Sequence, residues 1–302
     1  MDETVRWTHL KPREISELLL EVHQQVTSVR TIEKLLRYNK FRRRKAQKNV
    51  TMGDVPNRDE QFQNIDRLRK LYEKNGNPVL SMDTKKKEYL GNFYRDGQLY
   101  TQQTIQTNDH DFTSTADGII IPHGLYDLAR NHGYIHIGTS RDTSQFACDS
   151  IRHWWLSAGQ YQYQTATSIL LLCDGGGSNS SHYYIFKEAL QTLANELNIE
   201  IRIAHYPPYC SKYNPIEHRL FPHVTRACQG VVFKSMAIVS ELISRTKTAT
   251  GLAVTVAIID KVYEKGRKVS ESFREEMPII FDDYLPKWNY RAKPHASLAT
   301  VI

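Results

Sequence analysis

The sequence predicts an α/β fold, with a mixed sheet flanked by helices, preceded by a small module built from helices alone. Three observations support this expectation. Short apolar runs alternate with amphipathic stretches from residue 78 onward, the segment before residue 40 shows helical periodicity only, and a polar stretch at 41–60 separates the two parts. With 302 residues, of which 40% are hydrophobic, the chain is long enough for about two domains and apolar enough to bury a core.

Composition excludes several classes of protein. The longest apolar run, at 169–173, is far shorter than the roughly 18 residues that cross a membrane, so no membrane association is expected. The charged first residues are not followed by an apolar stretch, which argues against a secretory signal. The four cysteines form no CxxC pair and suggest no disulfide framework. We therefore expect a reduced protein of the cytoplasm.

Two short helices are expected near the N-terminus. Pro12 suits a first helical position, and apolar residues then recur at three- and four-residue spacing up to residue 22. Ser28 can cap a second helix, whose apolar positions recur in the same way as far as Leu36. Two helices across a tight turn, followed by basic residues, fit a helix-turn-helix, although any helical hairpin shows this pattern and a compact motif needs a third helix.

The basic excess lies almost entirely in the N-terminal part of the chain. The net charge is +7, and residues 1–75 contain 17 Lys and Arg against 11 Asp and Glu. The excess peaks at 37–48, a stretch with seven basic residues and no acid. Such a block predicts a polyanionic partner such as nucleic acid, or else a solvated flexible arm. The candidate DNA-binding residues here are Arg30, Lys34 and Arg37 on the second helix, followed by Arg42, Arg43, Arg44 and Lys45.

The elements that follow a helix at 59–75 have the order of a ribonuclease-H-like sheet, β-β-β-α-β-α-β-α. The run at 168–173 is apolar throughout, as expected for a strand buried on both faces. The expected strands are 78–84, 90–94, 118–129, 133–138, 168–173 and 199–204. The expected helices are 142–157, 182–197 and one that begins near Pro215 and is kinked by Pro222.

Three acidic residues fall at element ends in this order. Asp83 ends the strand at 78–84, Asp174 directly follows the strand at 168–173, and Glu217 lies in the first turn of the helix from Pro215. Ligands of open α/β sheets gather at the carboxyl ends of strands, so two neighbouring aspartates would project from one edge, with Glu217 brought over it. Three carboxylates would repel one another there, and a pair of Mg²⁺ ions would relieve the repulsion and suit phosphoryl transfer.

Each of the three acids can also be explained by a structural role alone, without catalysis or metal binding. Asp83 can be a turn residue at a strand end, and Asp174 begins the segment DGGGSN, which is rich in turn formers. Glu217 has the strongest alternative, because Asn-Pro-Ile-Glu at 214–217 is typical of a helix start: an N-cap, a proline at the first position and a glutamate that completes a capping box. If Glu217 only caps its helix, the next candidates for the third acid are Asp127 and Glu188.

Four segments resemble a known family. They are SMDTKKKE at 81–88, HGLYDLARN at 123–131, CDGGGSN at 173–179 and SKYNPIEHRLF at 211–221. In this order they closely resemble the Rhodopirellula-type DDE transposases of bacterial insertion sequences, and the resemblance extends from about Trp7 to Tyr290. Family members carry more chain before the tryptophan that matches Trp7, so we expect an N-terminal module that is truncated relative to the family.

The resemblance implies a ribonuclease-H-like catalytic domain at 76–302, whose acidic triad is Asp83, Asp174 and Glu217. It implies a metal-dependent cleavage of the element ends that frees a 3′-hydroxyl, followed by strand transfer into target DNA, with Mg²⁺ as a pair of ions and Mn²⁺ as a substitute. Residues 1–48 would be the helix-turn-helix-like DNA-binding module, and 49–75 a linker with a helix.

The same resemblance implies a homo-oligomer assembled on DNA in the bacterial nucleoid. Cations near the acids are candidates for neutralising phosphates, although a solvated surface would also contain them: Lys85, Lys86, Lys87, Lys212 and Arg219. Two alternatives stay open, namely a ribonuclease-H-like nuclease without joining activity and a catalytically inactive DNA-binding protein derived from a transposase. Joining activity would separate the first alternative from a transposase, and binding of a divalent metal would separate the second.

Overall fold

The computed structural model describes residues 5–45, 55–176 and 184–295. The chain divides into two compact units, Met1–Met52 and Gly53–Ile302, and each is described by itself. Parts of four predicted features lie outside the described residues: the end of the basic stretch, the middle of the polar linker, the second half of the glycine-rich turn after Asp174 and the start of the helix predicted at 182–197. The division of the chain into functional modules stays a prediction.

Both expected N-terminal helices are present, as α1 (Pro12–His23) and α2 (Val29–Tyr38). Pro12 occupies the first turn of α1, and Ser28 caps α2 by accepting a hydrogen bond from the N–H of Thr31 at 3.2 Å. Ile32 is the one buried hydrophobic side chain among the described residues of this unit. The described part of this unit therefore buries little apolar surface.

The second unit contains a mixed sheet, whose described strands follow the order β7-β4-β3-β1-β5-β6-β9-β8, with β2 paired to β3. The strands β1, β5 and β6 are parallel, whereas β3 is antiparallel to its neighbours β1 and β4. This central arrangement confirms the expected ribonuclease-H-like fold. The strands are β1 (Val79–Thr84), β2 (Glu88–Leu90), β3 (Gly118–Asp127), β4 (His132–Gly138), β5 (Ser168–Cys173), β6 (Glu200–His205), β7 (Ala253–Ile259), β8 (Ile280–Phe281) and β9 (Asn289–Ala292).

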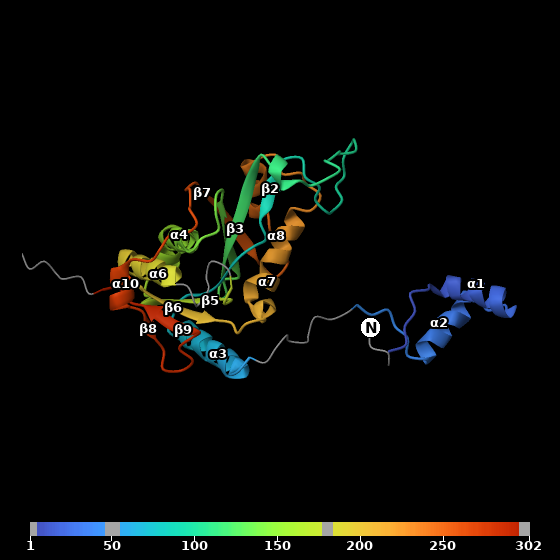
Figure 1. The fold of residues 1–302 in the computed structure, drawn as a ribbon, viewed down its shortest axis with the longest axis horizontal. Helices are drawn as coiled ribbons and strands as arrows, with labels where there is room; N and C mark the ends of the chain where they lie inside the picture. Colours follow the sequence, from blue (N-terminus) through green and yellow to red (C-terminus); the bar gives the residue numbers. More distant parts are fainter. Residues whose placement is uncertain (1–4, 46–54, 177–183, 296–302) are drawn as a thin grey trace, which may run out of the picture. The chain divides into compact units, whose positions relative to one another are not determined.

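Helices cover both faces of this sheet, with α4, α6 and α10 on one side and α7 and α8 on the other (Figure 1). None of the described helices is long and apolar enough to cross a membrane. The helices of this unit are α3 (Arg58–Lys74), α4 (Ser144–Trp154), α5 (Gln160–Gln162), α6 (Tyr184–Leu197), α7 (Pro215–Arg219), α8 (Phe221–Ala227), α9 (Met236–Ser244) and α10 (Glu271–Glu276).

The side chains of the central strands alternate between two core layers. Leu80 and Met82 of β1 pack in the layer that contains α4 and α6. Val79 of β1 packs instead with α3, together with Leu170 and Leu172 of β5. This alternation is what the two-residue period of a strand requires, and it explains why β5 is apolar from Ile169 to Cys173.

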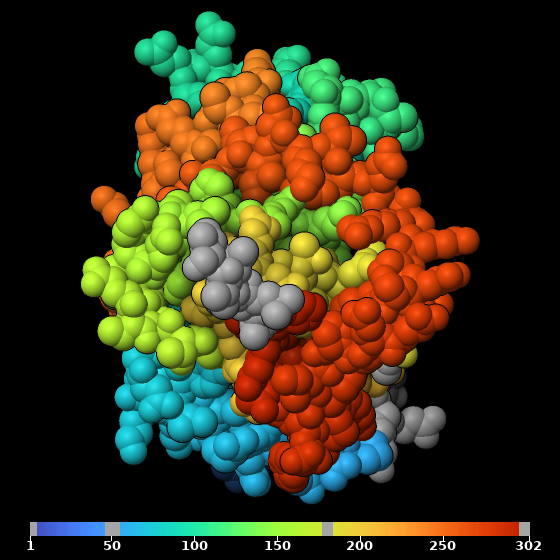
Figure 2. All heavy atoms as spheres, turned by 90° about the vertical axis from the view of Figure 1, so that its left-hand side faces the viewer, coloured from blue at the N-terminus to red at the C-terminus, as the bar shows by residue number. Residues whose placement is uncertain are grey.

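The C-terminal third of the chain completes the core on the α4 and α6 side. In the space-filling view its orange and red residues cover much of one face, beside the yellow-green residues around α4 and α5 (Figure 2). Phe273 of α10 and Tyr290 of β9 belong to the same buried cluster as α4 and α6. The segment after α9 is therefore part of this unit.

The structure corrects the predictions made from the sequence in two places. The strand expected at 90–94 is wrong, because β2 ends at Leu90 and is followed by Gly91, whose φ of +125° takes the backbone out of the extended conformation. The strands β7, β8 and β9 were not expected at all. In contrast, β5 has the predicted bounds, and the helix from Pro215 is interrupted as Pro222 predicts, because α7 ends and α8 begins around that proline.

Candidate active site

Asp83 and Asp174 lie side by side at the carboxyl ends of two neighbouring parallel strands. Met82 of β1 is paired with Cys173 of β5. Asp83 directly follows Met82 in the sequence, and Asp174 directly follows Cys173. Met82 and Cys173 both belong to the core layer that contains α4 and α6. Because side chains alternate along a strand, both aspartates face the opposite side of the sheet, where α3 and α7 lie.

Glu217 reaches this side on α7, whose first turn is tied to β1 by buried hydrogen bonds. Ser81 Oγ accepts from the N–H of Ile216 at 2.9 Å and donates to Asn214 Oδ1. Asn214 Nδ2 donates to the carbonyl oxygen of Met82 at 3.2 Å. Ser81 and Asn214 are both 0% exposed. Polar groups buried this completely are costly to leave unpaired, so the bonds hold the start of α7 at a fixed place beside the end of β1.

A glycine on β3 lets α7 approach the sheet. Gly124 pairs with Asp83 in the register of β1 and β3. A Cβ atom added to Gly124 would lie 2.7 Å from Ile216 Cδ1 and 2.7 Å from Phe221 Cε1. A larger side chain at this position would therefore push α7 away from the sheet and from the two aspartates.

The three carboxyl groups interact electrostatically. Burial raises the pKa of Asp83 to about 8, together with the charge of Asp174 and a hydrogen bond with Glu217. Burial also raises the pKa of Asp174, to which the charge of Glu217 contributes. No cation of the described chain is among the causes of either shift. The site therefore holds negative charge that a proton or a bound cation must balance.

The chemistry of these donors suits a divalent metal ion. Mg²⁺ and Mn²⁺ prefer carboxylate oxygens, and the carboxyl groups of Asp83, Asp174 and Glu217 are close enough here to affect one another's charge. As their side chains lie, however, no three His, Cys, Asp or Glu residues within the described ranges surround a point that could hold a metal ion. The proximity of Glu217 contributes to the raised pKa of Asp83. The donor set therefore fits a divalent metal ion by its chemistry.

The structure excludes the capping explanation for Glu217. In a capping box the backbone N–H of the N-cap residue donates to the glutamate side chain. Here the N–H of Asn214 donates to the carbonyl oxygen of Ser211 at 2.8 Å. The side chain of Asn214 makes no capping bond either, because its amide is bonded to β1. The segment at 214–217 has the sequence of a helix cap but serves as a link between α7 and the sheet.

The turn explanations for the two aspartates are compatible with a site. The N–H of Gly176 donates to Asp174 Oδ1 at 3.4 Å, and the N–H of Thr84 donates to Asp83 Oδ1 at 2.7 Å. Each of these bonds involves one carboxylate oxygen, Oδ1, of its aspartate. A turn role and a role in a site are therefore not alternatives.

The two substitute candidates for the third acid have structural roles. Asp127 lies at the far end of β3, where it accepts from the N–H of Arg130 at 3.1 Å and from the hydroxyl of Tyr163 at 2.7 Å. Glu188 lies on α6 in the other layer and accepts from the N–H and the hydroxyl of Ser270. Neither lies with Asp83 and Asp174, which leaves Glu217 as the candidate.

The cations predicted near the acids fall into two groups. Lys85 is only 13% exposed, and its Nζ lies 2.8 Å from Glu88 Oε1, a carboxylate that Arg95 also contacts, so the role of Lys85 at a phosphate stays a prediction. The remaining candidates are at least partly accessible to solvent: Lys86, Lys87, Lys212 and Arg219.

The predicted DNA-binding residues of the first unit are all exposed. Arg37 Nη2 lies 4.0 Å from Glu33 Oε2, and Arg42 Nη1 donates to the carbonyl oxygens of Arg37 and Phe41. Exposed contacts of this kind contribute little and leave the guanidinium groups solvated. The exposed residues are Arg30, Lys34, Arg37, Arg42, Arg43, Arg44 and Lys45.

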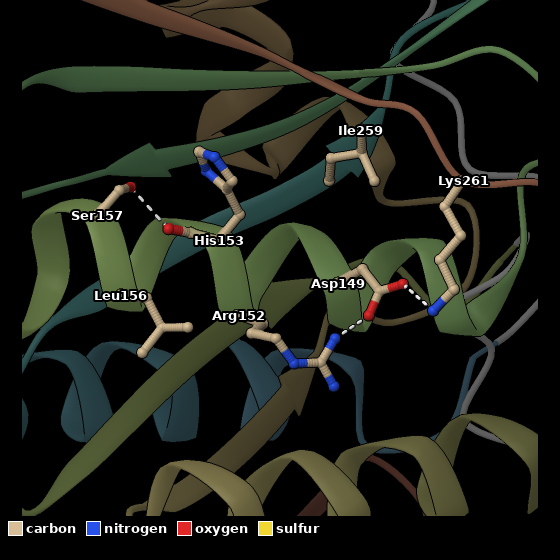
Figure 3. A pocket seen from close by; sticks show the side chains of 7 residues that line it. All are labelled: Asp149, Arg152, His153, Leu156, Ser157, Ile259 and Lys261. Carbon is tan, nitrogen blue, oxygen red and sulfur yellow. Dashed lines mark hydrogen bonds and ion pairs between the residues drawn. The ribbon is translucent and has the colours of Figure 1, made fainter.

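A pocket of about 530 Å³ lies away from the three acids, along α4 and the segment that follows β7 (Figure 3). Its acidic residue, Asp149, points toward both Arg152 and Lys261, and it pairs with each of them. Because α4 covers the opposite face of the sheet and this carboxylate is already neutralised, the pocket does not belong to the acidic site. It is lined by Asp149, Arg152, His153, Leu156, Ser157, Ile259 and Lys261.

Sequence reasoning missed three residues that build the site, namely Ser81, Asn214 and Gly124. All three lie in the segments that carry the family resemblance, which was the available signal. Their roles depend on contacts between β1, β3 and α7, and Ser81 and Asn214 are 133 positions apart in the chain. No local pattern shows such a contact.

Comparisons with known proteins agree with the resemblance. The family described as "Rhodopirellula transposase DDE domain" matches residues 1–294. No curated protein matches the sequence of this chain.

Solved structures with a similar fold include three forms of Mos1 transposase. The pre-cleavage Mos1 transpososome has 15% identity and a TM-score of 0.45, over 80% of this chain and 72% of that chain. The mariner Mos1 paired end complex with Mg has 14% identity and a TM-score of 0.46, over 80% and 73%. The catalytic domain of Mos1 mariner transposase has 14% identity and a TM-score of 0.41, over 64% and 81%.

The family match covers nearly the whole chain, including all three acids and the segments that position them. The chain therefore belongs to the Rhodopirellula transposase DDE family and is a DDE-type transposase.

Proposed function

We propose that this transposase cuts the ends of its insertion sequence to free a 3′-hydroxyl and then joins that hydroxyl to target DNA at the same acidic site. In the first step, water attacks the phosphodiester and the 3′-oxygen leaves as a hydroxyl. In the second step, the 3′-hydroxyl attacks a target phosphodiester and displaces a second 3′-oxygen. Both steps are in-line phosphoryl transfers, so one arrangement of acids can serve both.

The observation that carries this proposal is the proximity of Asp83, Asp174 and Glu217 on one face of the sheet, where the charges of the other carboxyl groups add to burial in raising the pKa values of Asp83 and Asp174. These three residues would hold Mg²⁺ or Mn²⁺. When bound, a pair of such ions would supply an activated attacking oxygen and stabilise the leaving oxygen. The raised pKa of Asp83 supports this role, because the same excess of negative charge that retains a proton also favours a divalent cation.

The exposed cations of the chain would bind the DNA on which the acidic site acts. Phosphate contacts to the basic residues from Arg30 to Lys45 would hold terminal DNA, largely without regard to sequence. Lys86, Lys87 and Lys212 would neutralise phosphates nearer to the acids. We also propose that the transposase pairs two element ends as a homo-oligomer on DNA.

Cleavage mapping on the flanking element ends tests this function. With Mg²⁺ present, we expect nicks at the element ends and, with target DNA added, joined products. Asp174→Asn should remove both products. Asp142→Asn is the matched control, because Asp142 accepts a hydrogen bond from Thr84 at 3.2 Å, and Thr84 faces the other side of the sheet from Asp83. Nicks without joined products would favour a nuclease, and no metal-dependent nicks would favour an inactive DNA-binding protein.

A further inference from the structure

A polar pocket of about 400 Å³ is lined in part by α7, the helix that also carries Glu217 of the acidic site. One wall comes from α7 and α8 and contributes His218, Arg219 and His223. The other wall comes from the β3–β4 turn and the loop before β7. No Asp or Glu lines this pocket, and its titratable side chains are one guanidinium, two imidazoles and the phenol of Tyr126.

The second wall is built from hydrogen-bonded polar groups. Tyr126 Oη donates to Asn131 Oδ1 at 2.9 Å, and Asn131 Nδ2 donates to the carbonyl oxygen of Thr250 at 3.1 Å. Thr248 Oγ1 lies 2.9 Å from Thr250 Oγ1 and accepts from the N–H of Leu252 at 3.1 Å. These bonds fix two hydroxyl groups opposite the basic wall.

A guanidinium, two imidazoles and hydroxyl groups around one hollow, without any acid, are the donors that a phosphate group requires. We infer that this pocket binds one backbone phosphate of the DNA strand whose cleavage takes place at the acidic site. The inference rests on the proposed function.

The position of the pocket gives the spacing of that phosphate. Gly124 of β3 is beside Asp83, and Tyr126 and Leu128 line the pocket two and four residues further along. A strand rises about 3.3 Å per residue, so these two residues lie roughly 7–13 Å from Gly124, in the direction that leads along β3 toward Asp127. Successive phosphates of one strand are separated by at least the axial rise of duplex DNA, about 3.4 Å per nucleotide, so the bound phosphate lies within about four nucleotides of the cleaved bond.

Methylphosphonate scanning tests this inference. A nicked duplex with the element's terminal sequence carries one neutral methylphosphonate at successive positions, and its affinity is measured with the whole protein. We expect wild-type affinity to fall about tenfold, equivalent to about 1.4 kcal/mol, when the neutral group is at one position within about four nucleotides of the nick, because a charge-assisted hydrogen bond to that phosphate is lost. Arg219→Ala should remove this penalty and reduce the salt slope by about 0.9.

Arg226→Ala is the matched control. Arg226 is an exposed arginine on α8 that does not line the pocket, so its variant should retain the positional penalty. If the methylphosphonate reduced the affinity of the wild type, Arg219→Ala and Arg226→Ala equally, the inference would be overturned. Cleavage of the unmodified duplex by the wild-type protein would still support the proposed function. Saturable binding of inorganic phosphate without any methylphosphonate effect would assign the pocket to a free anion and also overturn the inference. Failure of the wild-type protein to cleave any duplex would instead count against the proposed function.

Discussion

The charged side chains of the acidic site are held in fixed positions, whereas those of the basic N-terminal stretch are not held by buried contacts. Asp83, Asp174 and Glu217 are fixed by strand register and by buried hydrogen bonds. The cations from Arg30 to Lys45 are exposed and make few contacts. Single substitutions in the acidic site should therefore have large effects that depend on geometry, whereas substitutions in the basic stretch should have small effects that add.

The largest expected effect is that of Glu217→Gln on cleavage. The amide keeps the size of the side chain and its ability to hydrogen-bond Asp83, so the protein should fold and bind DNA. Loss of the carboxylate should slow cleavage about a thousandfold or more, because stabilising the leaving oxygen is worth several kcal/mol. Single-turnover cleavage is the measurement. A variant that melts at the wild-type temperature and cleaves at the wild-type rate would remove Glu217 from the site.

Asn214→Ala should weaken both folding and cleavage. The change leaves Ser81 Oγ and the carbonyl of Met82 without their buried partner, at a cost of about 2–4 kcal/mol in the free energy of unfolding. The start of α7 is then free to move, so cleavage should fall even at temperatures where the variant is folded. Urea denaturation and single-turnover cleavage measure the two effects. Unchanged cleavage by the folded variant would show that this link does not position Glu217.

The stability of the metal-free protein should depend on pH through Asp83. Its pKa is about 8 in the folded protein against an ordinary value of 3.8, so the folded state retains a proton that the unfolded state releases. The free energy of unfolding should therefore fall as pH rises from about 4 to about 8, by up to a few kcal/mol at about 1.4 kcal/mol per pKa unit. Asp83→Asn should flatten this decline and raise Tm at pH 8. The same slope in both proteins would assign the titration to another group.

Gly124→Ala should act through α7. The added Cβ meets Ile216 and Phe221 at 2.7 Å, so we expect a loss of about 1–3 kcal/mol in stability. Ile216→Val removes the Cδ1 atom at one of these contacts and should restore part of the stability in the double variant. Denaturant melts of the single and double variants give the coupling energy. Additive losses would mean that the glycine does not serve the approach of α7.

The basic stretch should show the smallest effect per residue. Replacing Arg42, Arg43, Arg44 and Lys45 with Ala should flatten the salt dependence of DNA affinity by about three to four units, at about 0.9 for each phosphate contact. Because these side chains are exposed, Tm should not change. Affinity measured over a salt series gives the slope. An unchanged slope would identify the stretch as a solvated arm.

The difference between the two regions also explains what the sequence could predict. The strands β1 and β5 were predictable because their apolar runs are local, and the aspartates that end these runs could be assigned to one sheet edge. For Glu217 the sequence left two explanations, because a helix cap and a site residue share the pattern at 214–217. Only the contact of Asn214 with β1 separates them.

The parts of the fold that the sequence did not predict depend on pairing between distant segments. The strand β7 lies beside β4, although more than 100 residues separate them in the chain. The helix α3 was expected with the linker, but Ile65, Leu68 and Tyr72 pack it against the sheet. A short amphipathic or alternating pattern gives the type of an element but not its partner.

A titration with Mn²⁺, followed by electron paramagnetic resonance of the free ion, tests the central claim most directly, because it needs no DNA and no activity. The account predicts that the wild-type protein binds Mn²⁺, that Asp83→Asn and Asp174→Asn lose this binding, and that Asp142→Asn keeps it. Mn²⁺ binding that is equal in the wild-type protein and in Asp83→Asn would contradict the assignment of these carboxyl groups as the metal site.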